Sequence, residues 1–203
     1  MCRLHLIPSF FLSLSLSNTQ VLDVIKQLWI DTRGYEAGKL GFLADMYSLL
    51  TIGQSIVFVE TKRDADMVHN TLSEAGYTCS VLHGDIEPEM RDRTMQAFRD
   101  GESTVLITTN VLARGVDVDN VCLVVNYDMP VEGRNKKPDF ETYLHRIGRT
   151  GRFGRKGTAI NLVNDEESLQ VLAAIEAHFA KNGKELIKKA EADPEALADV
   201  IEI

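Results

Sequence analysis

Positive charge is scarce in this sequence, and so is cysteine. The 203 residues hold 22 lysines and arginines against 30 aspartates and glutamates, which leaves a formal net charge of −8. This balance excludes a protein that coats nucleic acid through bulk charge, although a few well-placed arginines can still hold a phosphate. The three cysteines include no CxxC pair, so we expect Cys79 and Cys122 to be buried free thiols rather than disulfide or zinc ligands.

The sequence also lacks an apolar segment suited to crossing a membrane. Its most apolar stretch lies in "MCRLHLIPSFFLSLSLSNTQ", residues 1–20, where a serine-rich apolar run follows one arginine. This run of about a dozen residues matches the apolar region of a signal peptide and is too short to span a bilayer comfortably. Two interpretations remain, a secretory leader and a disordered or artefactual start. We expect the second, because the sequence that follows is typical of an intracellular protein.

The length and composition suit one soluble domain with a sizeable core, since 44% of the residues are hydrophobic and 26% are charged. Apolar runs rich in β-branched residues alternate with segments of helical periodicity, which predicts an α/β fold with a parallel sheet covered on both faces. Strands are expected at 24–30, 54–60, 78–83, 103–109, 121–127 and 157–163, and helices at 37–50, 63–74, 87–98, 139–149 and 166–180. We expect a leader at 1–20, the main domain at 21–182 and a C-terminal helical tail at 183–203, with Asp193 and Pro194 opening a short helix.

Nucleotide-binding folds of this class often carry a GxxxxGK[ST] loop, and none occurs here. Polar segments instead follow three expected strands, namely "ETK" (60–62), "HGD" (83–85) and "TNVLARGVDV" (109–118). Ligands of parallel sheets bind at the carboxyl ends of the strands. We therefore expect these loops and the arginine cluster described next to share one edge of the sheet. The acidic residues of "NDEES" are interpreted as a helix start capped by Asn164 or Asp165.

The arginine cluster is "HRIGRTGRFGRKG", residues 145–157, with four arginines, one lysine and four glycines. Arg149 and Arg152 lie three residues apart where a helix is expected to end, so both can face one point. Guanidinium groups grip phosphate oxygens in bidentate fashion. In the structural alternative, an arginine neutralises the end of a helix and a glycine caps it. That alternative would explain only one of the four arginines and one of the four glycines. The cluster therefore predicts a phosphate site. Asp117, beyond the Arg114–Gly115 turn, suits sugar hydroxyls, although Asp after Gly is also ordinary turn chemistry.

Together these segments resemble a known family. "SIVFVETK", "HGD", "FRDG", "TTNVLARGVDV" and "HRIGRTGRFGRKG" have the order and spacing of the second RecA-like lobe of DEAD-box ATP-dependent RNA helicases, over about residues 23 to 180. The resemblance implies a RecA-like parallel sheet with helices on both faces and no P-loop of its own. The long connection "PVEGRNKKPDFETYLHR", with "IKQLW" and "LLTIGQSIVFVETK", is similar to the branch that acts in messenger-RNA export at the nuclear pore.

The resemblance also implies roles for single residues. Arg149 and Arg152 would be arginine fingers that reach the γ-phosphate of ATP on another lobe, assisted by His145. Asp117 would contact the ATP ribose beside Gly115, while Arg114 and His145 would couple the two lobes. The residues implied in contacts with the RNA backbone are Thr61, Gly84, Arg91 and Thr109. The sequence departs from the family at Pro88, where Gln is common, which weakens the RNA assignment of Arg91.

The partners implied by the resemblance are ATP, single-stranded RNA, an N-terminal RecA-like lobe and nuclear-pore export regulators, with no membrane. That first lobe would supply the P-loop and hold Mg²⁺, so we expect this chain alone to be inactive, and to reside in the cytoplasm and at the nuclear pore rather than be secreted. Two alternatives remain open. The chain could be a truncated, non-catalytic module that binds RNA or a partner, or the second lobe of a DNA helicase.

Overall fold

The computed structural model describes residues 24–110, 121–151, 156–180 and 185–201. The apolar segment at 1–20 and the residues Arg114, Gly115, Asp117 and Arg152 lie outside these ranges. The strands of the main sheet are β1 (Ile25–Asp31), β2 (Gln54–Phe58), β3 (Cys79–Leu82), β4 (Val105–Thr108), β5 (Val121–Asn126), β8 (Gly157–Val163) and β9 (Ile187–Ala190). The helices are α2 (Gly38–Leu49), α3 (Lys62–Glu74), α4 (Pro88–Arg99), α5 (Phe140–Ile147), α6 (Glu166–Phe179) and α7 (Pro194–Val200).

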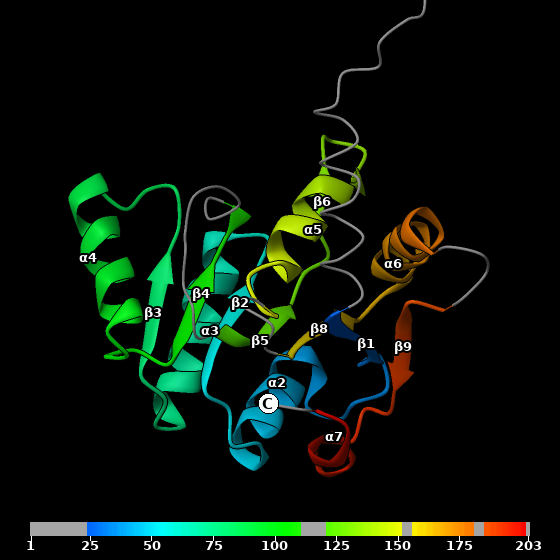
Figure 1. Cartoon of the computed structure of the whole chain (residues 1–203), viewed down its shortest axis with the longest axis horizontal. Helices are drawn as coiled ribbons and strands as arrows, with labels where there is room; N and C mark the ends of the chain where they lie inside the picture. The colour runs from blue at the N-terminus through cyan, green and yellow to red at the C-terminus, as the bar shows by residue number, and fades with distance from the viewer. Residues whose placement is uncertain (1–23, 111–120, 152–155, 181–184, 202–203) are drawn as a thin grey trace, which may run out of the picture.

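The seven strands form one parallel sheet in the order β3-β4-β2-β5-β8-β1-β9 (Figure 1). Every strand and helix expected from the sequence pattern is present, within a few residues of its expected bounds. Two features were not predicted. Residues 131–138, where no strand was expected, contain a small antiparallel hairpin of β6 (Val131–Glu132) and β7 (Lys137–Pro138). The strand β9 extends the sheet by pairing with β1.

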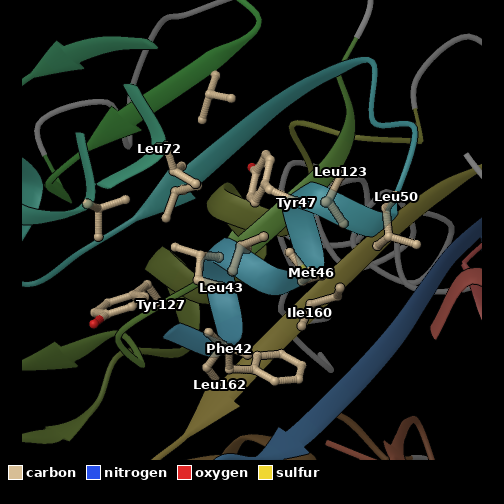
Figure 2. Packing of buried hydrophobic residues seen from close by; sticks show 14 of the residues in the cluster. Phe42, Leu43, Met46, Tyr47, Leu50, Leu72, Leu123, Tyr127, Ile160 and Leu162 are labelled. Carbon is tan, nitrogen blue, oxygen red and sulfur yellow. The ribbon is translucent and has the colours of Figure 1, made fainter. Parts of the chain in front are cut away.

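Helices cover both faces of the sheet, as expected for a RecA-like α/β fold (Figure 1). One face packs against α2, α3 and α7, and its core includes Phe42, Met46 and Tyr47 of α2. Figure 2 shows these α2 side chains with Leu123, Ile160 and Leu162 of the central strands. The other face packs against α4 through Phe98 and against α5 and α6 through Tyr143, Ile147 and Ile175. Burial of these apolar side chains, at roughly 25 cal/mol per Å², is the main stabilising contribution.

Side-chain caps set where several helices begin. Thr61 accepts a hydrogen bond from the Asp64 backbone at the start of α3, and Asp139 accepts one from Thr142 at the start of α5. Of the two candidates for the cap of α6, Asp165 is the one used, in a capping box with Ser168. Asp193 caps α7 and Pro194 is its first residue, which confirms the expected start of the final helix. These caps satisfy backbone N–H groups that a helix cannot pair internally.

Candidate functional site

Three of the residues expected to contact RNA lie at one edge of the sheet. Thr61, Gly84 and Thr109 follow the carboxyl ends of β2, β3 and β4, and these strands are neighbours in the sheet. Thr61 and Gly84 are exposed, whereas Thr109 is 9% exposed. The Thr109 backbone N–H donates to the Leu82 carbonyl at 3.3 Å, which joins the loop after β4 to the end of β3. The fold therefore brings these residues together, as the sequence predicted.

Arg91, the fourth of these residues, lies in the first turn of α4 and is half-buried. Its Nε donates to the Ile86 carbonyl at 2.7 Å and its Nη2 donates to the Gly84 carbonyl at 2.6 Å. Two donors of the guanidinium thus hold the backbone between β3 and α4. Pro88, the departure from the family pattern, is the first residue of α4, where a missing N–H costs nothing. Arg91 consequently supports the loop that carries Gly84.

Within the arginine cluster, the turn that follows α5 lies toward the opposite end of the sheet. The Thr150 hydroxyl lies 2.9 Å from the carbonyl of Val121 and 3.0 Å from that of Cys122, and both residues belong to the amino end of β5. Gly151 lies against Ile25, the first residue of β1. The expectation that the cluster shares the carboxyl edge with the other loops is therefore wrong for Thr150 and Gly151. A helix that connects parallel strands runs back along the sheet, so the residues after α5 arrive where β8 begins.

Two residues expected at the phosphate site fall within the described ranges. Arg149 follows α5, and its backbone N–H donates to the Arg146 carbonyl at 3.1 Å. Its exposed fraction is only 9%, which is small for a residue expected to reach a phosphate on another lobe. His145 is half-buried in the last turn of α5, one turn before Arg149. Arg114, Gly115, Asp117 and Arg152 were expected to complete this site, but they lie outside the described residues.

Arg146, another member of the cluster, is buried in the core. It is 1% exposed, and the centre of its guanidinium lies 4.9 Å from the centroid of the Phe58 ring. Its Nη1 donates to Asn126 Oδ1 at 3.1 Å and to the Asp128 carbonyl at 2.7 Å, and its Nη2 donates to Asn110 Oδ1. Burial lowers the pKa of Arg146 to about 10. Arg146, which was not among the residues expected at the phosphate, is therefore a core residue.

Sequence reasoning missed the partners of Arg146. Asn126 ends the apolar strand β5, and Asn161 lies in the middle of the apolar strand β8. Both side chains are fully buried, and Asn126 Nδ2 donates to Asn161 Oδ1 at 2.8 Å. A buried amide requires a polar partner. An asparagine inside an otherwise apolar strand was therefore the available signal for a polar network in the core.

Charged side chains connect the β6–β7 hairpin and α2 to the carboxyl edge of the sheet. Lys136 lies 3.6 Å from Glu60 and 3.7 Å from Glu167, while Lys39 lies 2.5 Å from Asp128. The Asp128 carboxylate also accepts a hydrogen bond from the Glu60 backbone at 2.8 Å. All of these charged residues except Lys39 line a cavity beside the start of α6. The ion pairs give Glu60, Asp128, Lys136 and Glu167 a structural role there.

Two cysteines lie within the described residues. Cys79 and Cys122 are free and half-buried, and burial raises the pKa of both thiols. Across the described part of the chain, no group of His, Cys, Asp and Glu side chains is placed to hold a metal ion. Among the helices within those same ranges, none has the length and apolar character needed to cross a membrane.

Comparison with protein families gives one match over most of the domain. Residues 38–154 match the family described as "Helicase conserved C-terminal domain". Among curated relatives, the ATP-dependent RNA helicase DBP5 of Eremothecium gossypii is 51% identical over 168 residues, which are 82% of this chain and 36% of the relative. The DBP5 protein of Saccharomyces cerevisiae is 50% identical over 168 residues and is covered to 34%. The chain thus spans about a third of the length of these relatives.

Solved structures are similar over nearly all of the described fold. A structure of the C-terminal domain of the DEAD-box protein Dbp5 has a TM-score of 0.79 and 46% identity, covering 89% of this chain and 98% of that one. S. cerevisiae Dbp5 bound to RNA and ADP BeF3 also has a TM-score of 0.79 and 46% identity, covering 88% of this chain and 45% of that one. A variant of S. cerevisiae Dbp5 bound to Nup159, Gle1, IP6 and ADP has a TM-score of 0.78 and 42% identity, covering 89% and 46%.

Proposed function

This chain belongs to the family of helicase conserved C-terminal domains, as the C-terminal RecA-like lobe of a DEAD-box protein, and from that premise we propose its activity. The chain is the C-terminal lobe of an ATP-dependent RNA helicase, and this helicase remodels RNA and RNA–protein complexes in messenger-RNA export. The observation that carries the proposal is the placement of Arg149 directly after α5, in a chain that matches RNA helicases at about 50% identity.

The proposed reaction is ATP hydrolysis stimulated by single-stranded RNA. Charge builds on the γ-phosphoryl oxygens as the bond to the leaving group loosens, and a guanidinium placed there stabilises the transition state more than bound ATP. Arg149 and Arg152 supply this charge to ATP bound on the first lobe, with His145 and Arg114 coupling the lobes, and Asp117 with Gly115 holding the ribose. The P-loop and the Mg²⁺-binding acids come from the first lobe, since this sequence contains no P-loop.

The proposed RNA surface is the carboxyl edge at β2, β3 and β4. Thr61, Gly84 and Thr109 lie on this edge, and Arg91 holds the backbone of Gly84. Backbone and hydroxyl groups of this kind suit the sugar–phosphate chain and select no base sequence. Because a relative was solved with Nup159, Gle1 and IP6, we propose that regulators of this kind bind the parent protein in the cytoplasm and at the nuclear pore.

The proposal is tested by joining this chain to the first lobe of a DEAD-box helicase and measuring ATP hydrolysis with and without single-stranded RNA. The chain alone should release no phosphate, and the two-lobe protein should show turnover that depends on RNA. Stimulation by single-stranded DNA to the same rate would favour a DNA helicase. Binding of RNA without any turnover in the joined protein would favour a non-catalytic binding module.

A further inference from the structure

The β6–β7 hairpin is a basic segment of an acidic chain. Its residues 131–138 include three basic side chains, Arg134, Lys136 and Lys137, against one acidic side chain, Glu132, while the whole chain has a formal net charge of −8. All four side chains are exposed. Basic residues at a hairpin tip are common on protein surfaces. What distinguishes this hairpin is where it stands and which of its cations are paired.

The hairpin stands at the carboxyl edge of the sheet, next to the proposed RNA surface (Figure 1). The Lys136 ammonium lies 3.6 Å from the carboxylate of Glu60, the residue directly before Thr61. The Glu60 backbone N–H donates at 2.8 Å to the carboxylate of Asp128, which lies between β5 and the hairpin. These two contacts fix the tip of the hairpin beside the loop that carries Thr61.

The order of the strands sets the direction in which an RNA strand would meet the hairpin. The carboxyl ends follow one another as β3 with Gly84, β4 with Thr109, β2 with Thr61, and then β5, which leads into the hairpin. Neighbouring strands lie about 4.8 Å apart, so the end of β5 is about 5 Å beyond the end of β2. A sugar–phosphate chain that lies along Gly84, Thr109 and Thr61 therefore reaches the hairpin when it is extended by a few nucleotides.

Ion pairs neutralise one cation of the hairpin and leave two unpaired. Lys136 lies between Glu60 and Glu167, and both carboxylates are within 3.7 Å of its ammonium. No ion pair or side-chain hydrogen bond joins Arg134 or Lys137 to another described residue. Lys136 thus cancels acidic charge that would repel a phosphate at this edge, while Arg134 and Lys137 remain available to bind one.

The two unpaired cations line one hollow on the hairpin. Its other lining residues are Glu132, Gly133 and Asn135. The hollow therefore offers a guanidinium, an ammonium and an amide, which are groups that contact the phosphates of nucleic acids. With Arg134, Lys137 and Glu132, its formal charge is +1. This charge suits a phosphodiester, which carries one negative charge, better than a free phosphate compound that carries several.

The backbone of Lys136 shows how the turn separates the paired cation from the unpaired ones. Its φ of 46° lies in the left-handed region, where Asn is more common than Lys. Its backbone N–H donates to the Gly133 carbonyl at 3.3 Å and closes the turn. From this position its side chain reaches Glu60 and Glu167, while Arg134 and Lys137 line the hollow on the hairpin itself.

We propose that the β6–β7 hairpin is a phosphate-binding extension of the RNA surface. Arg134 and Lys137 contact the backbone of an RNA strand that continues past Thr61, and Lys136 neutralises Glu60 and fixes the hairpin beside it. This inference rests on the proposed function, because it assigns further residues to the RNA surface of that helicase. The RNA site is then longer than the edge formed by β2, β3 and β4, and the added part selects no base sequence.

The first test uses the chain by itself and amide chemical shifts, which report weak binding residue by residue. It compares a short single-stranded RNA that covers the ends of β3, β4 and β2 with an RNA that is a few nucleotides longer. Both RNAs should shift the amides of Thr61 and Gly84, and only the longer one should shift those of Gly133 and Asn135. A hairpin that is unmoved by the longer RNA, or moved equally by both, overturns the inference. If neither RNA shifts any of these amides, the proposed RNA surface fails and the inference fails with it.

The second test measures the Kd for the same two RNAs in the two-lobe protein by fluorescence anisotropy. Joint substitution of Arg134→Ala and Lys137→Ala should remove most of the gain in affinity for the longer RNA. The log–log slope of affinity against salt should become shallower by about 1.4 for the longer RNA, at about 0.7 for each of two lost phosphate contacts, and the Kd for the short RNA should stay within about twofold. Arg93→Ala with Lys188→Ala is the matched control, since it removes one arginine and one lysine from exposed positions outside the hairpin.

The outcomes separate this inference from the proposed function. Equal losses of affinity for both RNAs, or the same loss in the control, overturn the inference, because net charge then explains the effect. If the two-lobe protein hydrolyses ATP in response to RNA but binds both RNAs equally well, the inference fails and the helicase proposal stands. Lys136→Asn keeps a residue that tolerates the left-handed backbone but leaves Glu60 without its cation, so it should also reduce the gain for the longer RNA. An unchanged gain in Lys136→Asn overturns the role given to Lys136.

Discussion

A Cβ atom on Gly157 would lie 2.1 Å from Oγ1 of Thr150 and 2.5 Å from the backbone nitrogen of Gly151. Gly157 begins β8, and Thr150 belongs to the turn directly after Arg149. The turn of the proposed arginine finger is thus packed against the start of a central strand with no room for a methyl group. Its position depends on this contact as much as on α5.

Gly157→Ala should therefore destabilise the chain and displace the Arg149 turn. Inserting one methyl group into a well-packed contact costs about 1 to 3 kcal/mol, which urea unfolding will measure. Gly34→Ala is the control, because an added Cβ there meets no atom within 4 Å, and it should change stability by less than about 0.5 kcal/mol. Equal stability of the two variants would show that the contact is not tight.

Arg149→Lys should lower kcat of the two-lobe protein by roughly 10³ or more, in the range of arginine-finger losses. Lysine keeps the positive charge but loses the planar fork that binds two phosphate oxygens. The KM for ATP and the thermal midpoint should change little, which steady-state kinetics and calorimetry can establish. Normal hydrolysis, or an unfolded variant, would identify Arg149 as a structural residue at the helix end.

Arg91→Ala should weaken binding of single-stranded RNA by the same factor for every base sequence. The substitution removes the donors that hold the Gly84 and Ile86 carbonyls and one positive charge near the backbone. Fluorescence anisotropy against salt should show a log–log slope that is shallower by about 0.7 if one phosphate contact is lost. Arg93→Ala removes the same charge from an exposed position on α4 and controls for net charge. A loss that varies with base sequence contradicts the prediction.

Asp165→Ala should cost about 1 kcal/mol of stability at pH 7, and the cost should shrink in acid. The Ser168 backbone N–H donates to the Asp165 carboxylate at 2.7 Å, and this bond, with a further contribution from the Ser168 side chain, holds the pKa of Asp165 below the ordinary value of 3.8. A lowered folded-state pKa means that the stabilisation is present above that value and is lost as the pH falls through the folded pKa. Urea unfolding at pH 7 and pH 3 measures the difference, with exposed Asp66→Ala as the control. A cost that stays constant over this range would exclude the capping carboxylate as its cause.

Much of the fold follows from patterns that are local in the sequence. Apolar runs such as "SIVF" and "VLIT" are buried strands because a parallel sheet covered on both faces leaves them no polar side. The start of α7 at Asp193 and Pro194 needs only neighbouring residues to satisfy the first N–H groups. The strand β9 escaped prediction because "IKKA" is short and carries two exposed lysines at the edge of the sheet. Such a strand has no apolar run to reveal it.

For the candidate site too, some features follow from the sequence and others only from the tertiary structure. The sequence by itself determined the residue types, the spacing of the arginine cluster and the loops that follow β2, β3 and β4. Only the tertiary structure decided that Thr150 and Gly151 of the cluster lie at the amino ends of β5 and β1, and that Arg146 is buried in the core. Identical guanidinium groups three residues apart look alike in a sequence. What separates them is the buried Asn126 and the Asn110 side chain, which are brought to Arg146 by strands far away in the chain.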